Sequence, residues 1–284
     1  MSCARRSTRP IARAGAERVA SSRLDAAIVA RRLARSRTAA AKLIADGRVT
    51  VDGKPVVKAS AQVDDESDIV VALPDHYVSR GAHKLIAALD AFDVDPRGRL
   101  ALDLGASTGG FTQVLLERGA RHVLAVDVGH GQLSVPVKGD PRVSNIEGVN
   151  ARYLTAEALA QASGIAESPD LVVGDLSFIS LTHVLPAARA SVAPESDFVM
   201  LIKPQFEVGR TGVKEGIVRD PVLRADAVAG VLWAAWDLGL GTAGLVPSPI
   251  AGTHGNREYL CWMSAVRGAN PTEWVDRVST MTGA

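Results

Sequence analysis

A glycine-rich turn at residues 103–111 constrains the fold of this chain more than any other feature. An apolar run at 100–104 predicts a buried strand that leads into the turn, and a helix is expected at 112–118. A second apolar strand then ends at Asp127. Strand, glycine turn, helix, strand and acid is the order found at nucleotide-type cofactor sites on doubly wound sheets. The sequence therefore predicts an α/β domain with a cofactor site at this edge of its sheet.

The spacing within the turn distinguishes between cofactors. Its glycines are Gly105, Gly109 and Gly110, which is not the G-x-G-x-x-G spacing that brings a helix N-terminus to a pyrophosphate. Asp103 precedes the first glycine by two residues, and an acid there suits a cationic ligand. S-adenosylmethionine carries an ammonium and a sulfonium but no phosphate. The turn therefore favours an S-adenosylmethionine site over a dinucleotide site or an ordinary turn without a ligand.

The rest of the second half of the chain alternates apolar strands with helices. A helix expected at 84–92 leads into the turn, and the alternation predicts a doubly wound, mainly parallel seven-stranded sheet covered on both faces. The strands are expected at 100–104, 122–127, 143–147, 170–175, 197–202, 244–248 and 258–264.

A smaller, basic unit precedes this domain. Residues 1–60 hold 14 Lys and Arg against 4 Asp and Glu, although the whole chain has a net charge of only +1. Such a basic block on an acidic body predicts contact with a polyanion. We expect a disordered basic tail at 1–21, a small α+β domain at 22–73, a linker at 74–80 and the large domain at 81–284.

Local signals within the small unit support its α+β character. Helices are expected at 24–34 and 38–45, with Ser36 as the N-cap of the second and Gly47 at its end. Strands follow at 49–51, 55–57 and 68–73. Asp52-Gly53 joins the first two strands and is typical of a tight hairpin turn.

The cysteines and the longest apolar run bear on where the protein works. Cys3 and Cys261 are the only cysteines, which is too few for a disulfide framework and fits a reducing, cytoplasmic location. The longest apolar run, 225–241, contains Asp226 and Asp237, so no membrane span is expected. Neither metal ligation nor membrane association is predicted.

Four charged residues stand where a doubly wound sheet gathers its active site. Asp175 and Lys203 end apolar strands, Glu258 begins one, and Lys84 lies at the entry to the large domain. Burying a lysine is costly unless it is paired, and the two acids are candidate partners. Such a set suits methylation of an alcohol, because the enzyme must align an in-line attack and remove the hydroxyl proton. The sequence leaves open which lysine is the base, and ordinary surface ion pairs remain the alternative.

Two motifs that this chain lacks exclude other classes of methyl acceptor. Methyltransferases that act on base amines usually carry Asp/Asn-Pro-Pro-Tyr after the fourth strand, whereas this chain has Asp175-Leu176-Ser177-Phe178. Carbon-5 methylation of pyrimidines needs a cysteine nucleophile, and neither cysteine lies in a suitable loop. Attack by an oxygen atom is the remaining alternative.

The small unit resembles the αL RNA-binding domain of a small-subunit ribosomal protein, pseudouridine synthases and tyrosyl-tRNA synthetases. The resemblance rests on residues 23–25, 33–37, 47–53 and 57–58, together with Ala41 and Ile44. It implies a basic face that follows RNA phosphates, although solvated surface charge is the alternative. This face would consist of Arg23, Arg35, Arg37, Lys42 and Lys58.

From about residue 22 onward the chain resembles the TlyA family, ribosomal RNA 2′-O-methyltransferases that carry a hemolysin name and are related to FtsJ. The matching segments are 78–85, 103–111, 127–133, 150–154, 175–181, 203–207 and 255–259. The resemblance implies a monomeric enzyme that uses S-adenosylmethionine to methylate cytidine riboses in ribosomal RNA or ribosomal subunits. In this family the modification accompanies capreomycin susceptibility.

The resemblance also assigns roles to residues. The family's Lys-Asp-Lys-Glu tetrad corresponds to Lys84, Asp175, Lys203 and Glu258. Its cofactor contacts correspond to Asp103, Gly105, Ala106, Ser107, Thr108, Gly109, Gly110, Phe111, Asp127, Val128, Asn150 and Ala151.

Two departures and two alternatives accompany this assignment. The basic tail has no counterpart in the family pattern, and Asp75 stands where a basic or neutral residue is expected. A membrane-active hemolysin would need a spanning helix or an amphipathic barrel pattern, and the sequence has neither. A non-catalytic ribosome-binding factor would not need the intact tetrad.

Overall fold

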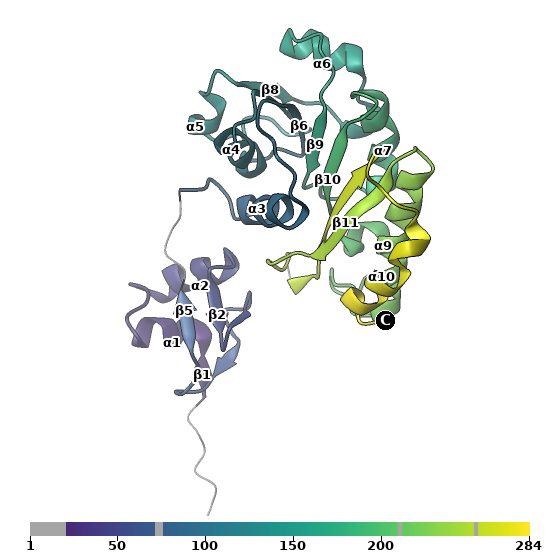
Figure 1. Ribbon diagram of the computed structural model, residues 1–284. Coiled ribbons are helices and arrows are strands. Elements are labelled where there is room, and N and C mark those ends of the chain that lie inside the picture. The colour runs from purple at the N-terminus through teal and green to yellow at the C-terminus, as the bar shows by residue number, and fades with distance from the viewer. Residues whose placement is uncertain (1–20, 72–75, 210–211, 253–254) are drawn as a thin grey trace, which may run out of the picture.

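The computed structural model describes residues 21–71, 76–209, 212–252 and 255–284. The predicted tail at 1–21 lies outside these ranges except for Ser21, and so do Asp75 and the start of the predicted linker. Figure 1 shows a small unit formed by the first part of the chain and a larger α/β unit formed by the rest.

The small unit is α+β, as predicted. Two helices pack together, and a buried core of residues such as Leu24, Ile28 and Ile44 lies between them and short antiparallel strands. Its elements are β1 (Ser22–Arg23), α1 (Leu24–Ala30), α2 (Arg37–Ala45), β2 (Val49–Val51), β3 (Lys54–Pro55), β4 (Gln62–Val63) and β5 (Ile69–Val71).

Local signals explain most of these boundaries. The Ser36 side chain accepts a hydrogen bond from the Ala39 amide (3.1 Å), so the predicted N-cap is confirmed. Asp52 and Gly53 both have positive φ, at 51° and 72°, as the predicted two-residue hairpin turn requires. The first helix ends four residues earlier than expected, because Arg32 adopts a left-handed conformation (φ 60°) and the Leu33 amide donates back to the Ile28 carbonyl oxygen.

The large unit contains one seven-stranded sheet in the order β11-β12-β10-β9-β6-β7-β8. Every neighbouring pair is parallel except those made by β12, so the predicted mainly parallel sheet is confirmed. The strands are β6 (Leu100–Leu104), β7 (His122–Asp127), β8 (Val143–Glu147), β9 (Leu171–Gly174), β10 (Asp197–Ile202), β11 (Gly241–Pro247) and β12 (Tyr259–Ser264).

Helices cover both faces of this sheet (Figure 1). Side chains of β6 alternate between the two cores, so that Leu100, Leu102 and Leu104 enter one and Ala101 enters the other. The first core is covered by α6 (Ala156–Ser163), α7 (Leu181–Ala190), α9 (Pro221–Trp236) and α10 (Val275–Thr282), and the second by α3 (Gly81–Phe92), α4 (Gly110–Glu117) and the nearby α5 (Val135–Lys138). Within the described residues, no helix combines the length and hydropathy needed to span a bilayer.

Two elements of the large unit begin three residues earlier than expected, and each begins at a glycine. Helix α3 begins at Gly81, three residues early, and β11 begins at Gly241 rather than at 244. In β11 the register shifts between Thr242 and Gly244, so the strand continues through a bulge. The described part of the predicted linker, 76–80, packs on the large unit, where the Val78 amide donates to Gln113 Oε1 at 3.0 Å.

Candidate active site

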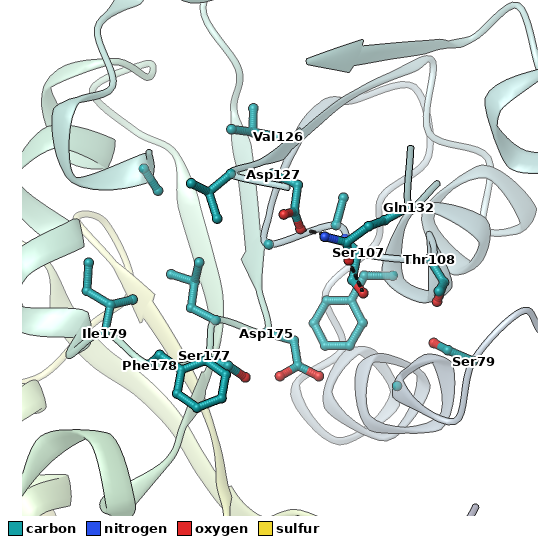
Figure 2. Close-up of a pocket in the computed structure, with 18 of the residues that line it drawn as sticks. Ser79, Ser107, Thr108, Val126, Asp127, Gln132, Asp175, Ser177, Phe178 and Ile179 are labelled. Carbon is teal, nitrogen blue, oxygen red and sulfur yellow. Dashed lines mark hydrogen bonds between the residues drawn. The ribbon is translucent and has the colours of Figure 1, made fainter. Parts of the chain in front are cut away.

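A cavity of about 680 Å³ lies at the carboxyl edge of the sheet, beside the turn after β6 and the β9–α7 loop (residues 175–180). These two strands are neighbours where the strand order reverses, which is where open α/β sheets bind ligands. The volume is in the range of pockets that hold small molecules. In Figure 2, Ser107, Thr108, Asp127 and Gln132 lie on one side of the cavity, and Asp175, Ser177 and Phe178 lie across from them.

The glycine turn keeps its backbone close to this cavity. Gly105 has φ +79°, and a Cβ atom there would come within 3.2 Å of the Asp175 carbonyl oxygen, so a larger residue would push the two loops apart. Ser107 also adopts a left-handed conformation, with φ 49°. Asp127 stabilises the turn, because its two carboxylate oxygens accept from the amides of Ser107 (2.8 Å) and Gly129 (2.7 Å).

Most of the predicted cofactor residues line the cavity. Those that do are Gly105, Ala106, Ser107, Thr108, Gly110, Phe111, Asp127, Val128, Asn150 and Ala151. Sequence reasoning missed several neighbours that have no distinctive signal, among them Ser79, Gln132, Val149 and Ile179. Gly109 does not line the cavity; it caps α4 with φ +96°, and a Cβ atom there would meet Leu133 and Val137.

Asp103 is also absent from the cavity wall, and this corrects the expectation that it faces a cationic ligand. It lies inside β6 rather than after it, and its side chain is on the α4 side of the sheet. There it is fully buried and accepts a hydrogen bond from Thr112 Oγ1 at 2.6 Å. Burial raises the pKa of Asp103 to about 7 against the opposing hydrogen bond from Thr112.

The raised pKa of Asp103 predicts how the stability of the folded protein depends on pH. Because the folded protein holds this proton more tightly than the unfolded chain, the contribution of Asp103 to stability falls as pH rises from 3.8 to about 7. Asp103→Asn keeps an acceptor for Thr112 and does not titrate. We therefore expect its Tm to exceed that of the wild type more at pH 8 than at pH 5. Thermal unfolding at both pH values measures this, with Asp237→Asn on the surface as the control, and an unchanged difference would contradict it.

The four predicted catalytic side chains meet at the cavity as a row of alternating charges. Lys203 Nζ lies 2.6 Å from Asp175 Oδ1, and Lys84 Nζ lies 3.6 Å from Asp175 Oδ2. Lys84 also donates to Glu258 Oε2 at 2.7 Å. Both lysines and the glutamate are buried, with exposed fractions of 5% for Lys84, 8% for Lys203 and 4% for Glu258.

The topology explains why residues so distant in sequence converge. Asp175 follows the parallel strand β9, and Lys203 follows its neighbour β10, so both lie at the carboxyl edge. Strand β12 runs antiparallel, and its first residue, Tyr259, pairs with Ile202 at the end of β10. Glu258 therefore reaches the same edge from the start of a strand, and Lys84 reaches it from the first turn of α3.

The charges in this row depend on one another. Burial disfavours ionisation of Asp175, but the ammonium groups of Lys84 and Lys203 outweigh it and keep the pKa of that carboxyl below its usual value. Buried charges of this kind are stable only when they are paired, and removing one partner typically destabilises a protein by about 3–5 kcal/mol. In this row each lysine contacts at least one carboxylate, and each carboxylate contacts at least one lysine.

Residues after Asp175 add two features that sequence reasoning left without a role. Lys203 Nζ donates to the Ser177 hydroxyl at 2.8 Å, so the loop after β9 contacts the second lysine twice. Phe178 is 92% exposed at the cavity and has a left-handed backbone with φ 64°. A bulky residue with positive φ is strained, and such strain is frequent at functional sites.

The predicted RNA-binding residues of the small unit are all exposed: Arg23, Arg35, Arg37, Lys42 and Lys58. Arg23 and Arg37 also form ion pairs of 3.0 Å with Asp25, which is nearly buried. The hydrogen bond from Arg23 and the neighbouring charges lower the pKa of Asp25 to about 2. These two arginines are thus fixed in orientation on the surface of the small unit.

Comparison with known families agrees with both halves of this description. The FtsJ-like methyltransferase family matches residues 77–265, and the S4 domain family matches residues 22–70. The fold and the site therefore define a methyltransferase of the FtsJ-like class with an S4 domain in front of it.

Individual relatives show which family within this class the chain belongs to. The chain is 50% identical over 244 residues to the 16S/23S rRNA (cytidine-2′-O)-methyltransferase TlyA of Mycobacterium tuberculosis strain H37Rv, covering 85% of this chain and 89% of the relative. It is 38% identical to Hemolysin A of Brachyspira hyodysenteriae, covering 84% and 98%. A solved structure of a hemolysin-named protein from Streptococcus thermophilus superposes with a TM-score of 0.70 at 34% identity, covering 93% and 97%. The chain belongs to the TlyA family.

Proposed function

We propose that this protein transfers a methyl group from S-adenosylmethionine to the 2′-hydroxyl of a ribose in ribosomal RNA, with cytidine as the nucleoside. The observation that carries the proposal is the row of Lys203, Asp175, Lys84 and Glu258 on the wall of a ligand-sized cavity. The choice of ribosomal RNA and cytidine follows the name of the Mycobacterium tuberculosis relative.

The residues around the cavity fit the proposed methyl donor. Asp127 presents a carboxylate that suits ribose hydroxyls, and the glycine turn exposes backbone without side chains that would fill the space. Asn150 and Ala151 line the wall that the resemblance assigns to the cofactor. When bound, S-adenosylmethionine supplies a methyl group on a cationic sulfonium, which leaves as a neutral thioether.

Lys203 is the better candidate for the general base. Lys84 contacts two carboxylates, whereas Lys203 contacts only the shared Asp175 and the hydroxyl of Ser177. A neutral amine at Lys203 keeps two N–H bonds for these partners and points its lone pair elsewhere. The ribose hydroxyl would pass its proton to Nζ, which would make the ribose oxygen the stronger nucleophile. General base assistance of this kind contributes about 10²–10⁴-fold.

The acceptor nucleoside would rest on Phe178. Its ring is almost fully exposed beside the cavity, and the Phe206 ring supports it from a centroid distance of 5.3 Å. Exposed aromatic rings stack on unpaired bases of RNA, because every base offers a π face. A base held there would bring its ribose toward Lys203.

Replacing Phe178 therefore tests the acceptor side of the site. Stacking on an aromatic ring contributes about 1–3 kcal/mol per base, so Phe178→Ala should raise the KM for RNA by roughly 10- to 100-fold. Phe178→Trp retains a ring and should restore most of the activity. Steady-state kinetics with ribosomal subunits measure both variants, and Val266→Ala, which removes another exposed apolar side chain, is the control. A KM for the cofactor that rises as much as that for RNA would contradict the assignment.

The small unit would recruit the RNA. Its exposed arginines and lysines can contact phosphates, which gives affinity without reading sequence. We infer that the enzyme acts as a monomer in the cytoplasm, where its proposed substrate, a ribosomal RNA or a ribosomal subunit, is found.

The test of the proposed function is direct. Purified protein is incubated with methyl-labelled S-adenosylmethionine and ribosomal subunits that lack the modification, and the labelled nucleotide is mapped by mass spectrometry. We expect label on a ribose 2′-oxygen. Protein that binds both cofactor and RNA but leaves no methyl mark would instead be a ribosome-binding factor without catalysis.

A further inference from the structure

Glu207 is a partly buried carboxylate that the proposed chemistry does not use. It is the last residue of α8 (Pro204–Glu207), the short helix that begins directly after Lys203. Its Oε1 accepts a hydrogen bond from the Leu181 amide at 2.9 Å, and its Oε2 accepts from Ser180 Oγ at 2.5 Å. Glu207 thus joins the segment that carries one catalytic lysine to the far end of the β9–α7 loop.

Burial of the Glu207 carboxylate costs free energy, and its hydrogen-bond partners offset part of that cost. Burial disfavours its charged form and raises the pKa of Glu207, although the Leu181 amide and the Ser180 hydroxyl oppose that shift. Leu181 is the first residue of the ten-residue helix α7, whose N-terminal amides favour a negative charge. A carboxylate therefore holds this helix end more strongly than a neutral side chain would.

The same segment contacts the β9–α7 loop at two further points. Lys203 Nζ contacts Asp175 and Ser177 at the start of the loop, and the Phe206 ring packs beside Phe178 in its middle. Glu207 supplies the third contact, at its end. Strained backbone such as that of Phe178 persists only when its surroundings fix it, and these three contacts provide that constraint.

We propose that Glu207 is a positioning residue that fixes the β9–α7 loop, and so holds Phe178 and Asp175 in the conformation that receives the acceptor nucleoside. The proposal rests on the proposed function, because it assigns the loop to the RNA side of that reaction. It separates the roles of two neighbouring residues: Lys203 would take the proton, while Glu207 would touch neither substrate nor cofactor.

The contacts of Glu207 predict which properties its replacement should change. Without Glu207 the loop keeps its contacts with Lys203 and Phe206 but loses the hydrogen bonds at Ser180 and Leu181. A misplacement of about 1 Å in a reacting group can lower the rate by roughly 100-fold. The glycine turn on the other side of the cavity should keep its conformation, because Asp127 accepts from the Ser107 amide and the Val126 carbonyl oxygen accepts from the amides of Gly105 and Ala106.

Three variants of the full-length protein test this. Glu207→Ala removes both acceptors, whereas Glu207→Gln keeps one acceptor for Leu181 and a polar group for Ser180. Asp220→Ala is the matched control, since Asp220 Oδ1 accepts from the Val222 amide at the start of α9 and Asp220 is exposed and does not line the cavity. Each is assayed with unmodified ribosomal subunits, for S-adenosylmethionine affinity by calorimetry, and for amide hydrogen exchange across 176–182.

Glu207→Ala should lower kcat/KM for RNA by roughly 10- to 100-fold and speed exchange in 176–182, while the Kd for S-adenosylmethionine changes less than about threefold. Glu207→Gln should recover most of the rate, and Asp220→Ala should resemble the wild type. Unchanged kinetics and exchange in Glu207→Ala, with an active wild type, would overturn the assignment alone. Equal loss of cofactor binding and RNA methylation without rescue by Gln would mean a general structural role and would also overturn it. A wild type that transfers no methyl group would overturn the proposed function itself.

Discussion

Lys203→Ala is expected to reduce methyl transfer to ribosomal RNA by about 10³-fold or more while leaving the protein folded and able to bind S-adenosylmethionine. The loss combines the general base contribution, typically about 10²–10⁴-fold, with the loss of the partner that orients Asp175. The fold should survive because Asp175 still faces Lys84 at 3.6 Å when Lys203 is gone. Lys84→Ala would be less informative, since it leaves Glu258 buried without its 2.7 Å ion-pair partner.

Two further variants show whether this loss is chemical. Lys203→Arg keeps the positive charge but cannot act as a base near neutral pH, so it should remain nearly inactive. Lys138→Ala removes an exposed lysine from α5 and should leave the rate unchanged. Single-turnover transfer of label, together with calorimetry of cofactor binding, measures all three. Substantial activity in Lys203→Arg would indicate that Lys203 acts through its charge and that another group takes the proton.

The strands and the grouping of the charged side chains could be predicted because both follow from short-range patterns. Buried parallel strands are nearly continuous apolar runs, and 100–104, 122–127 and 197–202 begin and end as expected. Polar residues that end such runs meet at one edge of a doubly wound sheet, which is why Asp175 and Lys203 could be grouped. Glu258 joins them because β12 is antiparallel, and the sequence gives only weak evidence of strand direction.

Other features depend on contacts that no local pattern encodes. Asp103 looked like an acid at a strand end, but the alternation of side chains in β6 turns it toward Thr112 and away from the cavity. Phe178 is an ordinary apolar residue in the sequence, but in the structure its backbone has positive φ and its side chain is exposed. The contact of Glu207 with the β9–α7 loop joins residues 26 positions apart and could not be inferred from spacing.

The two sides of the cavity are therefore built by different means. On one side, Asp127 holds a glycine turn whose backbone approaches the proposed methyl donor. On the other, Lys203 and Glu207 hold a loop that presents Phe178 and Asp175 to the proposed acceptor. A variant on the donor side should weaken binding of the methyl donor and leave RNA affinity nearly unchanged. A variant on the acceptor side should do the reverse.

Among donor-side variants, Asp127→Ala should weaken cofactor binding most strongly. It removes both carboxylate acceptors, so the left-handed Ser107 loses the hydrogen bond that holds its amide, and the cavity loses its acidic group. It would also remove the proposed hydrogen bonds from the ribose hydroxyls of the cofactor, and hydrogen bonds to charged groups typically contribute about 1.5–3 kcal/mol each. We expect the Kd for S-adenosylmethionine to rise about 100-fold or more, since roughly 1.4 kcal/mol corresponds to each factor of ten.

A matched control separates this effect from the loss of a carboxylate in general. Asp140 Oδ1 accepts from the amide of Arg142 two residues on, as Asp127 Oδ1 accepts from Gly129, but Asp140 does not line the cavity. Asp140→Ala should therefore keep the wild-type affinity for the cofactor. RNA affinity should be the same in both variants, because the small unit that would bind phosphates is unchanged. Cofactor binding within about threefold of the wild type in Asp127→Ala would contradict its assignment to the donor side, given that two charge-assisted hydrogen bonds are lost.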